Sequence, residues 1–402
     1  MRSVVLVGGG QAGAVAARTL RRRGYDGAIT VLADEPHRPY QRPPLSKEYL
    51  AAADDSGLEL LPEAWTTEHA IEVRTGTRAA EICAREGAVL LADGSRIPAD
   101  AVLLATGARA RRLPGLDGDG VFGLRTRDDA DGLRERLGPG THLVMVGGGF
   151  IGAEVASVAR TRGAAVTMLE AGPVPLAQAV GARLGEACAR IARANGVDVR
   201  VNTRVDGLRT GTRGLVVRTS DGDLEADVVV VGVGAEPNVE LAVASGLEVG
   251  HGVLVDQYCR TSTEHVYAAG DVAEHPHGGR RVRVEHVDNA TRQAAVAARN
   301  MLGEQTPYDD PHWFYSDQFG RNLQHVGHAG THDRMVVRGD LEDESWTAFF
   351  LDDAGLVTAA FALDAGEEIA VARELISMRL GVPEHVLADR DADLFEALEE
   401  VG

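Results

Sequence analysis

The sequence predicts an α/β protein with two Rossmann-like dinucleotide-binding domains, followed by a C-terminal α+β domain. One observation is a β-branched run that breaks into glycines and then into a helical pattern, at residues 4–20. A second is that the same pattern recurs at residues 143–160. A third is a change of composition after Pro311, because the last quarter of the chain holds half of its aromatic residues. The repeat indicates an internal duplication with a different domain attached to it.

The first glycine-rich turn has the residues that a dinucleotide pyrophosphate requires. Gly8 permits a tight turn from strand to helix, and Gly10 lets the pyrophosphate approach the backbone. Gly13 lets the helix lie close to the strand. The next apolar run ends at Asp34 and Glu35, where a carboxylate accepts a hydrogen bond from an adenosine ribose. An ordinary glycine-rich turn is the alternative for one such unit.

The second turn repeats this arrangement and makes the alternative much weaker. Its predicted cofactor-binding residues are Gly147, Gly149, Phe150, Ile151 and Gly152. The strand that follows the helix is again closed by an acid, Glu170. Two complete units of this kind predict two dinucleotides.

Composition restricts the class of protein. With 402 residues, the chain is too long for one ordinary domain, and its 44% hydrophobic and 25% charged residues are typical of a soluble globular protein. The net charge of −19 argues against nucleic acid as a partner, because phosphate binding requires an excess of Lys and Arg. No apolar run is long enough to span a bilayer, and no leader precedes the first strand, so we expect no membrane partner and a cytoplasmic protein.

The cysteines point away from metal and thiol chemistry. Cys83, Cys188 and Cys259 are far apart, and none has the spacing of a metal site or of a Cys-x-x-Cys pair. We therefore expect no metal and inert thiols.

Each half also has apolar strands that end at glycines, where further cofactor contacts are expected. Ala105, Thr106 and Gly107 end the run at 101–108. In the second half, Gly234 follows the run at 227–231. Later, Gly270 and Asp271 follow another short apolar segment, which predicts a strand, a glycine and a carboxylate at a helix start. Beyond 313, alternating segments at 335–338 and 346–350 predict antiparallel strands, and residues 367–380 predict a helix.

Four stretches resemble the motifs of one family. They are residues 38–47, 147–154, 268–271 and 313–318. With them, the chain resembles over essentially its whole length the FAD-containing, NADH-dependent ferredoxin reductases of bacterial oxygenase systems. Those reductases serve ring-hydroxylating dioxygenases and cytochromes P450, and they are related to glutathione reductase.

The resemblance implies which cofactor each part binds. The first glycine-rich turn with the helix after it would form a cradle for FAD, and the second would form a cradle for NAD(H). The FAD-binding domain would comprise residues 1–112 and 241–312. An NAD-binding domain at 113–240 and a C-terminal domain at 313–402 complete the predicted order. Asp271 would then fix a ribityl hydroxyl or a group near the pyrophosphate, and a plain helix N-cap is the alternative.

The resemblance also implies the residues that act at the flavin. Lys47, from the proline-rich loop, would pair with Glu154, on the helix of the second cradle. The alternative is that both are solvated surface charges, the commonest fate of Lys and Glu. Arg42 would contact the flavin edge or a phosphate, and an exposed loop arginine is equally open.

The segment 285–287 departs from the family at one position. Val287 stands where several dioxygenase reductases have a tryptophan beside the flavin, which puts aromatic shielding in doubt. Glu285 and His286 precede it, and His286 is either a hydrogen-bond donor to the flavin edge or a buried structural histidine.

Glu170 favours NADH over NADPH, because a carboxylate accepts from a free 2′-hydroxyl and repels a 2′-phosphate. Val174 and Gln178 stand where many relatives have arginines, so the adenosine ribose has fewer partners and a 2′-phosphate fewer still.

These inferences predict an electron-transfer enzyme that takes hydride from NADH onto FAD and reduces an acidic [2Fe-2S] ferredoxin. The ferredoxin would in turn serve a cytochrome P450 or a Rieske-type oxygenase. The loop at 40–47 has no cysteine, which excludes a dithiol relay beside the flavin.

Three alternatives remain open: a rubredoxin reductase, a quinone reductase, and an NADH-sensing flavoprotein similar to apoptosis-inducing factor. For a ferredoxin, a docking patch is expected from a set of arginines whose alternative is a solvated loop: Arg280, Arg281, Arg283 and Arg321.

Overall fold

The computed structural model describes residues 1–211 and 214–401. By their internal contacts the residues form two compact units, each assembled from separate stretches of chain. The first unit comprises Met1–Pro43, Asp55–Arg109 and Ala235–Asp310. The second unit comprises Pro44–Asp54, Ala110–Gly234 and Pro311–Gly402.

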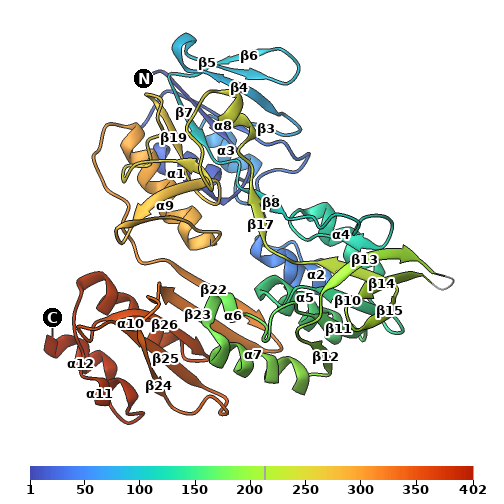
Figure 1. Ribbon diagram of the computed structural model, residues 1–402. Coiled ribbons are helices and arrows are strands. Elements are labelled where there is room, and N and C mark those ends of the chain that lie inside the picture. The colour runs from blue at the N-terminus through green and yellow to red at the C-terminus, as the bar shows by residue number, and fades with distance from the viewer. Residues whose placement is uncertain (212–213, 402) are drawn as a thin grey trace. The chain divides into compact units, whose positions relative to one another are not determined.

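The first unit is built on a parallel sheet with the strand order β19-β7-β1-β2-β3. Its strands are β1 (Ser3–Val7), β2 (Ala28–Leu32), β3 (Ile71–Arg74), β7 (Ala101–Leu104) and β19 (Val266–Ala268). Helices α1 (Gln11–Arg22) and α9 (Val287–Met301) pack side by side, and Figure 1 shows them together.

Strand β1 is buried on both faces, as its uninterrupted apolar sequence requires. Val4 and Leu6 point into the core that includes residues of α1 and α9. Val5 and Val7 point into a second core on the other face. The alternation follows from the period of two along a strand, and burial on both faces is typical of a parallel sheet.

Smaller elements complete the first unit. An antiparallel sheet consists of β4 (Ala79–Cys83), β5 (Ala88–Leu91) and β6 (Arg96–Pro98). Another three-stranded sheet consists of β18 (Val253–Leu254), β20 (Ala273–His277) and β21 (Arg280–Arg283). The short helices are α3 (Glu63–Glu68) and α8 (Glu240–Ala244).

The part of the second unit formed by Ala110–Gly234 repeats the first parallel sheet, with the order β12-β11-β10-β16-β9. Its strands are β9 (Val121–Phe122), β10 (His142–Val146), β11 (Ala165–Leu169), β12 (Val197–Arg200) and β16 (Val228–Val231). Strand β10 lies between β11 and β16 as β1 lies between β2 and β7. Its helices are α4 (Arg127–Arg136), α5 (Phe150–Thr161), α6 (Ala177–Val180) and α7 (Ala182–Ala194). A three-stranded antiparallel sheet consists of β13 (Val205–Thr210), β14 (Leu215–Thr219) and β15 (Gly222–Ala226).

The C-terminal part of the second unit is an antiparallel sheet with the order β22-β23-β26-β25-β24. Its strands are β22 (Trp313–Gln318), β23 (Arg321–Gly327), β24 (Arg334–Arg338), β25 (Trp346–Leu351) and β26 (Val357–Leu363). One face packs on α10 (Gly366–Met378), α11 (Glu384–Ala388) and α12 (Leu394–Val401), and the other packs on α6 and α7. The predicted fold class, two Rossmann-like domains and an α+β domain, is confirmed.

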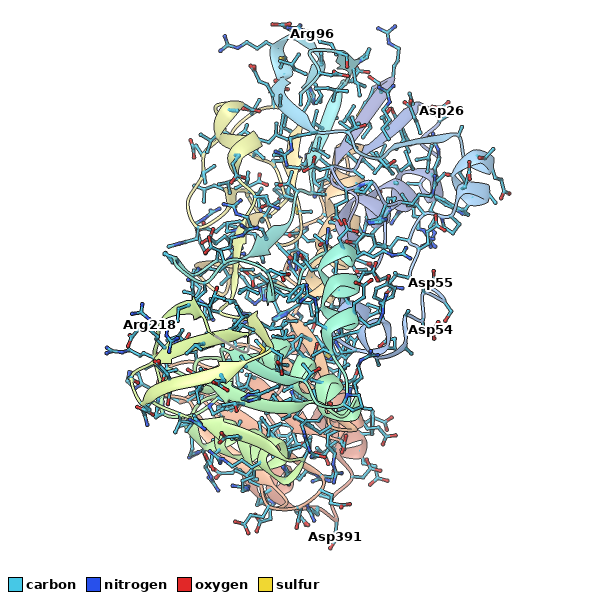
Figure 2. The ribbon with its side chains drawn as sticks, turned by 90° about the vertical axis from the view of Figure 1, so that its right-hand side faces the viewer. Asp26, Asp54, Asp55, Arg96, Arg218 and Asp391 are labelled. Carbon is cyan, nitrogen blue, oxygen red and sulfur yellow. The ribbon has the colours of Figure 1, made fainter. Side chains whose placement is uncertain are left out.

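A short early segment belongs to the second unit. Helix α2 (Glu48–Ala52) places Leu50 in the core beneath α4 and α5. The Tyr49 hydroxyl donates to Asp131 Oδ1 at 2.8 Å, and Arg162 donates to the Ala51 carbonyl at 2.6 Å. Figure 2 shows Asp54 and Asp55 on the exposed loop where the chain leaves this segment.

No helix among residues 1–211 and 214–401 combines the length and apolar character needed to cross a bilayer.

Candidate functional site

The first cradle lies where β1 passes into α1. A Cβ on Gly8, whose φ is +137°, would collide with the Ala105 carbonyl, and a Cβ on Gly13 would collide with the Gly8 carbonyl. A Cβ on Gly10 would meet nothing within 4 Å. Two glycines therefore allow close backbone packing, whereas Gly10 leaves open space at the helix N-terminus, as a bound pyrophosphate requires.

The second cradle is built in the same way, between β10 and α5. Gly147 has a φ of +104°, and its Cβ would collide with the Gly232 carbonyl. The Cβ of Gly152 would collide with the Gly147 carbonyl, while that of Gly149 would have open space. Gly232, which sequence reasoning did not single out, is thus the counterpart of Ala105. Both cradles fit a dinucleotide.

The two acids after β2 have different surroundings. Asp34 forms an exposed ion pair with Arg78, with 2.6 Å between Oδ2 and Nη2. Glu35 is held by Arg42, 2.6 Å from its Oε1, and by the Tyr40 hydroxyl. The more enclosed of the two acids is therefore Glu35.

Arg42 is not an exposed loop arginine. Although burial opposes the charged form, the charges of Tyr40, Glu35 and Asp271 raise the pKa of Arg42. The guanidinium thus lies within electrostatic range of Asp271, beside the first cradle's strands, where it can contact an anionic ligand.

Asp271 is buried, but it does not start a helix. It lies in a turn between β19 and β20, which Gly270 makes possible with a φ of +80°. The Ala273 amide donates to the Gly270 carbonyl at 2.9 Å and closes the turn. The expected helix start is wrong because the chain turns into a strand, and the N-cap alternative fails with it.

His286 is the N-cap residue of α9, next to Glu285 and Val287. Burial lowers the pKa of His286 to about 4, against the opposing effect of Asp271 and Asp288. The imidazole is therefore neutral at neutral pH and keeps one N–H donor. Glu285 is paired with Arg283, with 2.6 Å between the charged atoms.

One of the strand ends predicted to contact the cofactor is held by hydrogen bonds to the segment around Asn238. Within the first unit, the Thr106 hydroxyl donates to the Asn238 carbonyl at 2.8 Å, and the Asn238 side chain donates back to the Thr106 carbonyl at 2.8 Å. Gly107 and Gly234 have φ of +64° and +97°, which suits glycines at the end of a strand.

Glu170 is held in place by backbone donors. It accepts from the Gly148 amide at 2.9 Å and from the Gly172 amide at 2.7 Å. A carboxylate fixed at the end of β11 has lone pairs left for a ribose hydroxyl. Val174 precedes α6 and Gln178 lies within it.

Phe150 and Ile151, the first two residues of α5, have different surroundings. Ile151 is 44% exposed, which is unusual for a large apolar side chain at a helix start. Phe150 instead packs edge-on against Phe314, with 4.7 Å between ring centroids.

Lys47 and Glu154 form a buried ion pair within the second unit. The Lys47 Nζ lies 2.9 Å from Glu154 Oε2, and the side chains are 11% and 3% exposed. The interpretation of these residues as solvated surface charges is therefore wrong. Burial of a charged pair is costly unless further hydrogen bonds satisfy it.

Two serines supply those hydrogen bonds. The Ser46 hydroxyl donates to Glu154 Oε2, and the Ser316 hydroxyl donates to Oε1 at 2.6 Å. The ring of Tyr315 lies beneath Lys47, with 5.4 Å from Nζ to the ring centroid. Sequence reasoning missed both serines as site residues, although Ser46 and Ser316 stand inside motifs that carried the resemblance.

The arginines expected to form a docking patch are largely engaged with carboxylates. Arg281 lies 3.5 Å from Glu274, and Arg283 lies 2.6 Å from Glu285. Arg321 forms ion pairs with Asp364 and Glu344. Because these pairs neutralise much of the positive charge, the expected basic patch is weaker than the sequence indicates.

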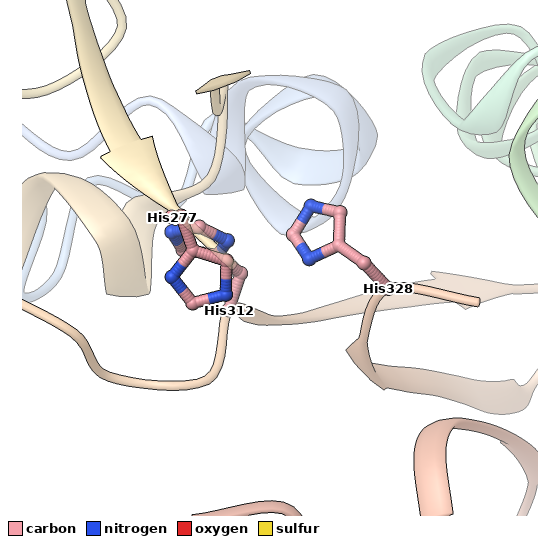
Figure 3. A group of neighbouring side chains, drawn as sticks. All are labelled: His277, His312 and His328. Atoms are coloured by element: carbon pink, nitrogen blue, oxygen red, sulfur yellow. The ribbon is translucent and has the colours of Figure 1, made fainter. Parts of the chain in front are cut away.

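Two histidines at the start of the C-terminal sheet were also not foreseen. His312 precedes β22 and His328 follows β23, and their rings meet edge to face with 4.9 Å between centroids (Figure 3). The Gly327 amide donates to the His312 carbonyl at 2.9 Å. The contact closes this end of the hairpin.

Comparison with known families divides the chain at the same change of composition. Residues 2–294 match the family model described as pyridine nucleotide-disulphide oxidoreductase. Residues 313–398 match the family model described as reductase C-terminal.

Curated relatives and solved structures match over nearly the full length. Rhodocoxin reductase of Rhodococcus erythropolis is 38% identical over 98% of this chain and 93% of its own. The ferredoxin–NAD(+) reductase component of the anthranilate 1,2-dioxygenase system of Burkholderia cepacia is 40% identical over 93% of each chain. A chain of the covalent putidaredoxin reductase–putidaredoxin complex is similar with a TM-score of 0.95 and 34% identity, over 100% of this chain and 99% of that one.

Proposed function

Because the chain belongs to the pyridine nucleotide-disulphide oxidoreductase family, we propose that it is an NADH:ferredoxin oxidoreductase with FAD. Its cofactors are FAD and NAD(H), and its partner is a [2Fe-2S] ferredoxin that serves an oxygenase. One NADH would reduce two ferredoxins, each by one electron, with release of NAD+ and one proton. The relatives named above include a ferredoxin–NAD(+) reductase of a dioxygenase system and a reductase solved in complex with putidaredoxin.

The observation that carries the proposal is the pair of equivalent cradles in one chain. Each has two glycines whose Cβ atoms would collide with backbone and one glycine beside open space. Bound FAD accepts hydride and passes on electrons singly, which is chemistry that the protein side chains do not supply. The chain's task is then to bind, orient and polarise.

Disulfide chemistry, which the family name includes, is excluded by the cysteines of this chain. Cys188 and Cys259 are buried, and burial raises the pKa of both thiols, that of Cys188 to about 12. A buried protonated thiol is a poor nucleophile. Cys83 alone cannot form an intramolecular dithiol.

We assign the roles of residues on this basis. Residues of the first cradle, with Glu35, Arg42, Asp271 and His286, hold FAD. Residues of the second cradle, with Glu170, hold NADH in preference to NADPH. Lys47 and Glu154 act at the flavin and nicotinamide, where a buried ion pair steadies developing charge.

We also propose the domain limits and the location of the protein. Residues 1–112 and 241–312 form the FAD-binding domain, 113–240 the NAD-binding domain and 313–402 the C-terminal domain. The reductase C-terminal match at 313–398 supports the last limit. A cytoplasmic location suits a source of NADH and a soluble ferredoxin.

The test is NADH-dependent reduction of cytochrome c by the purified flavoprotein, with and without an added [2Fe-2S] ferredoxin. We expect turnover that depends on ferredoxin and falls as salt rises, because charged surfaces steer the encounter. Parallel assays with rubredoxin and a quinone identify the acceptor. Faster turnover with either of these, or a flavin that NADH reduces but that passes no electrons to any acceptor, would refute the ferredoxin assignment.

A further inference from the structure

The C-terminal sheet contributes a strand that runs along the helix of the second cradle. Phe314 and Ser316 of β22 face Phe150 and Glu154 of α5, and the Phe319 amide after the strand donates to Ser157 Oγ at 2.7 Å. Two strand residues advance about 6.6 Å and four helix residues about 6 Å, so the two elements stay in register over these contacts. The register places Ser316 against Glu154.

The hydroxyl of Ser316 is oriented by a second side chain. Ser316 is fully buried, and Gln318 Nε2 donates to its oxygen at 3.3 Å. Because that oxygen accepts from Gln318, its own proton is free to be donated to Glu154 Oε1, 2.6 Å away. The strand thus presents a donor with a fixed direction to one oxygen of the carboxylate.

The other carboxylate oxygen is held from a different part of the second unit. Glu154 Oε2 lies 2.9 Å from Lys47 Nζ and accepts from the Ser46 hydroxyl. If Oε1 lost its donor, the buried carboxylate could rotate about its terminal torsion. Lys47 would then lose its fixed partner.

We propose that Ser316, oriented by Gln318, is a positioning residue by which the C-terminal domain fixes the carboxylate of Glu154 and, through it, Lys47. This inference rests on the proposed function for the role of Lys47 and Glu154, but the hydrogen bond itself does not. The C-terminal domain therefore takes part in hydride transfer from NADH, in addition to any contact with a partner protein.

The experiment compares Ser316→Ala, Ser316→Thr and the matched control Ser157→Ala in the holoenzyme. Ser157 Oγ accepts its hydrogen bond from the Phe319 amide, at the same contact between α5 and the C-terminal sheet. Flavin reduction by NADH is followed by rapid mixing, which separates the limiting rate from the NADH dissociation constant. We expect Ser316→Ala to lower the limiting rate about tenfold, the effect of one hydrogen bond to a charged group, with an NADH dissociation constant within about twofold.

The conservative variant Ser316→Thr and the control Ser157→Ala should both keep the wild-type limiting rate within about twofold. Equal losses in Ser316→Ala and Ser157→Ala, or no loss in Ser316→Ala, would overturn the proposal.

A readout without turnover separates this inference from the proposed function. The infrared carboxylate band of Glu154, identified by difference from Glu154→Gln, should change in Ser316→Ala and be unchanged in Ser157→Ala. If NADH failed to reduce the wild-type flavin, the proposed function would fall, while this band would still decide whether Ser316 fixes Glu154. An unchanged band in Ser316→Ala would exclude the positioning role.

Discussion

Two glycines of the second cradle have different roles, which substitutions can distinguish: Gly152 permits close backbone packing, and Gly149 leaves space for a ligand. Alanine at Gly152 would place its Cβ against the Gly147 carbonyl, whereas alanine at Gly149 would meet open space at an ordinary φ of −77°. We expect Gly152→Ala to lower the free energy of unfolding by about 1–3 kcal/mol, the usual cost of overpacking. Gly149→Ala should leave stability unchanged and weaken NADH binding about tenfold, because its methyl group occupies space needed by the pyrophosphate.

Thermal unfolding and NADH titration of the two variants check this prediction. Loss of stability in Gly149→Ala, or unchanged stability in Gly152→Ala, would contradict it.

His286 gives the protein a pH-dependent stability of known sign. Burial lowers its pKa to about 4 in the folded chain, whereas an unfolded histidine has a pKa of about 6.5. Between these values the unfolded chain binds more protons, so the free energy of unfolding falls as pH drops from about 6.5 to 4. At pH 5 this group alone should cost about 2 kcal/mol relative to pH 7.

Urea unfolding at pH 7 and pH 5 measures the effect. The loss between the two pH values should be smaller by about that amount in His286→Gln than in wild type. The control is His385→Gln, a change on the exposed part of α11. Its free energy of unfolding should fall between pH 7 and pH 5 by as much as that of wild type. Equal losses in wild type and His286→Gln would show that His286 titrates normally.

At the residue scale, the sequence predicted backbone roles better than side-chain roles. The duties of Gly8 and Gly13 follow from spacing, because only a strand-to-helix turn uses glycines in that pattern. Ser316 could not be predicted, since 162 positions separate it from Glu154 and a lone serine carries no periodic signal. The supposed helix at Asp271 failed because a glycine followed by an acid suits a turn as well as a helix start.

At the scale of elements, helix α2 depends on one buried tyrosine. The Tyr49 hydroxyl donates to Asp131 and accepts from Arg127 at 2.9 Å, and both arginines of α4 that flank its ring lie within 5.4 Å of the ring centroid. Tyr49→Phe removes both hydrogen bonds to charged groups, and we expect a loss of about 1.5–3 kcal/mol in the free energy of unfolding.

The loosened helix should be detectable locally. Amide hydrogen exchange of residues 47–53 should become faster in Tyr49→Phe, because α2 is fixed to α4 through this side chain. Glu135→Gln, an exposed change on α4, is the control and should exchange as wild type does. If Tyr49→Phe made amide exchange faster only in other segments, the proposed dependence of α2 on Tyr49 would be wrong.

Strands and helices of the two cradles were predictable because their hydrophobic periods are long and repeated. The contact of β22 with α5 could not be predicted, since the sequence at 313–318 shows only a cluster of aromatic residues. Nor does the proline-rich loop show that residues 44–54 pack with the second unit: Tyr49 and Leu50 are apolar enough for any core, and their partners lie about 80 positions later.

For the whole molecule, the duplication and the composition change gave the fold class, and the resemblance gave the chemistry. What the sequence could not give is which stretches assemble into each compact unit. The chain passes between the units at positions 43/44, 54/55, 109/110, 234/235 and 310/311. Compactness depends on contacts between distant stretches, which local patterns do not encode.

This interleaving has a consequence for biosynthesis. The stretch 44–54 leaves the ribosome before any of the chain that buries it, and Lys47 must wait for Glu154 and then for Ser316 before its surroundings are complete. The first unit likewise lacks α9 until residue 301 has been made. Neither unit can finish folding while the nascent chain is short: α2 stays exposed until α5 has been made, and the first unit stays incomplete until α9 has been made.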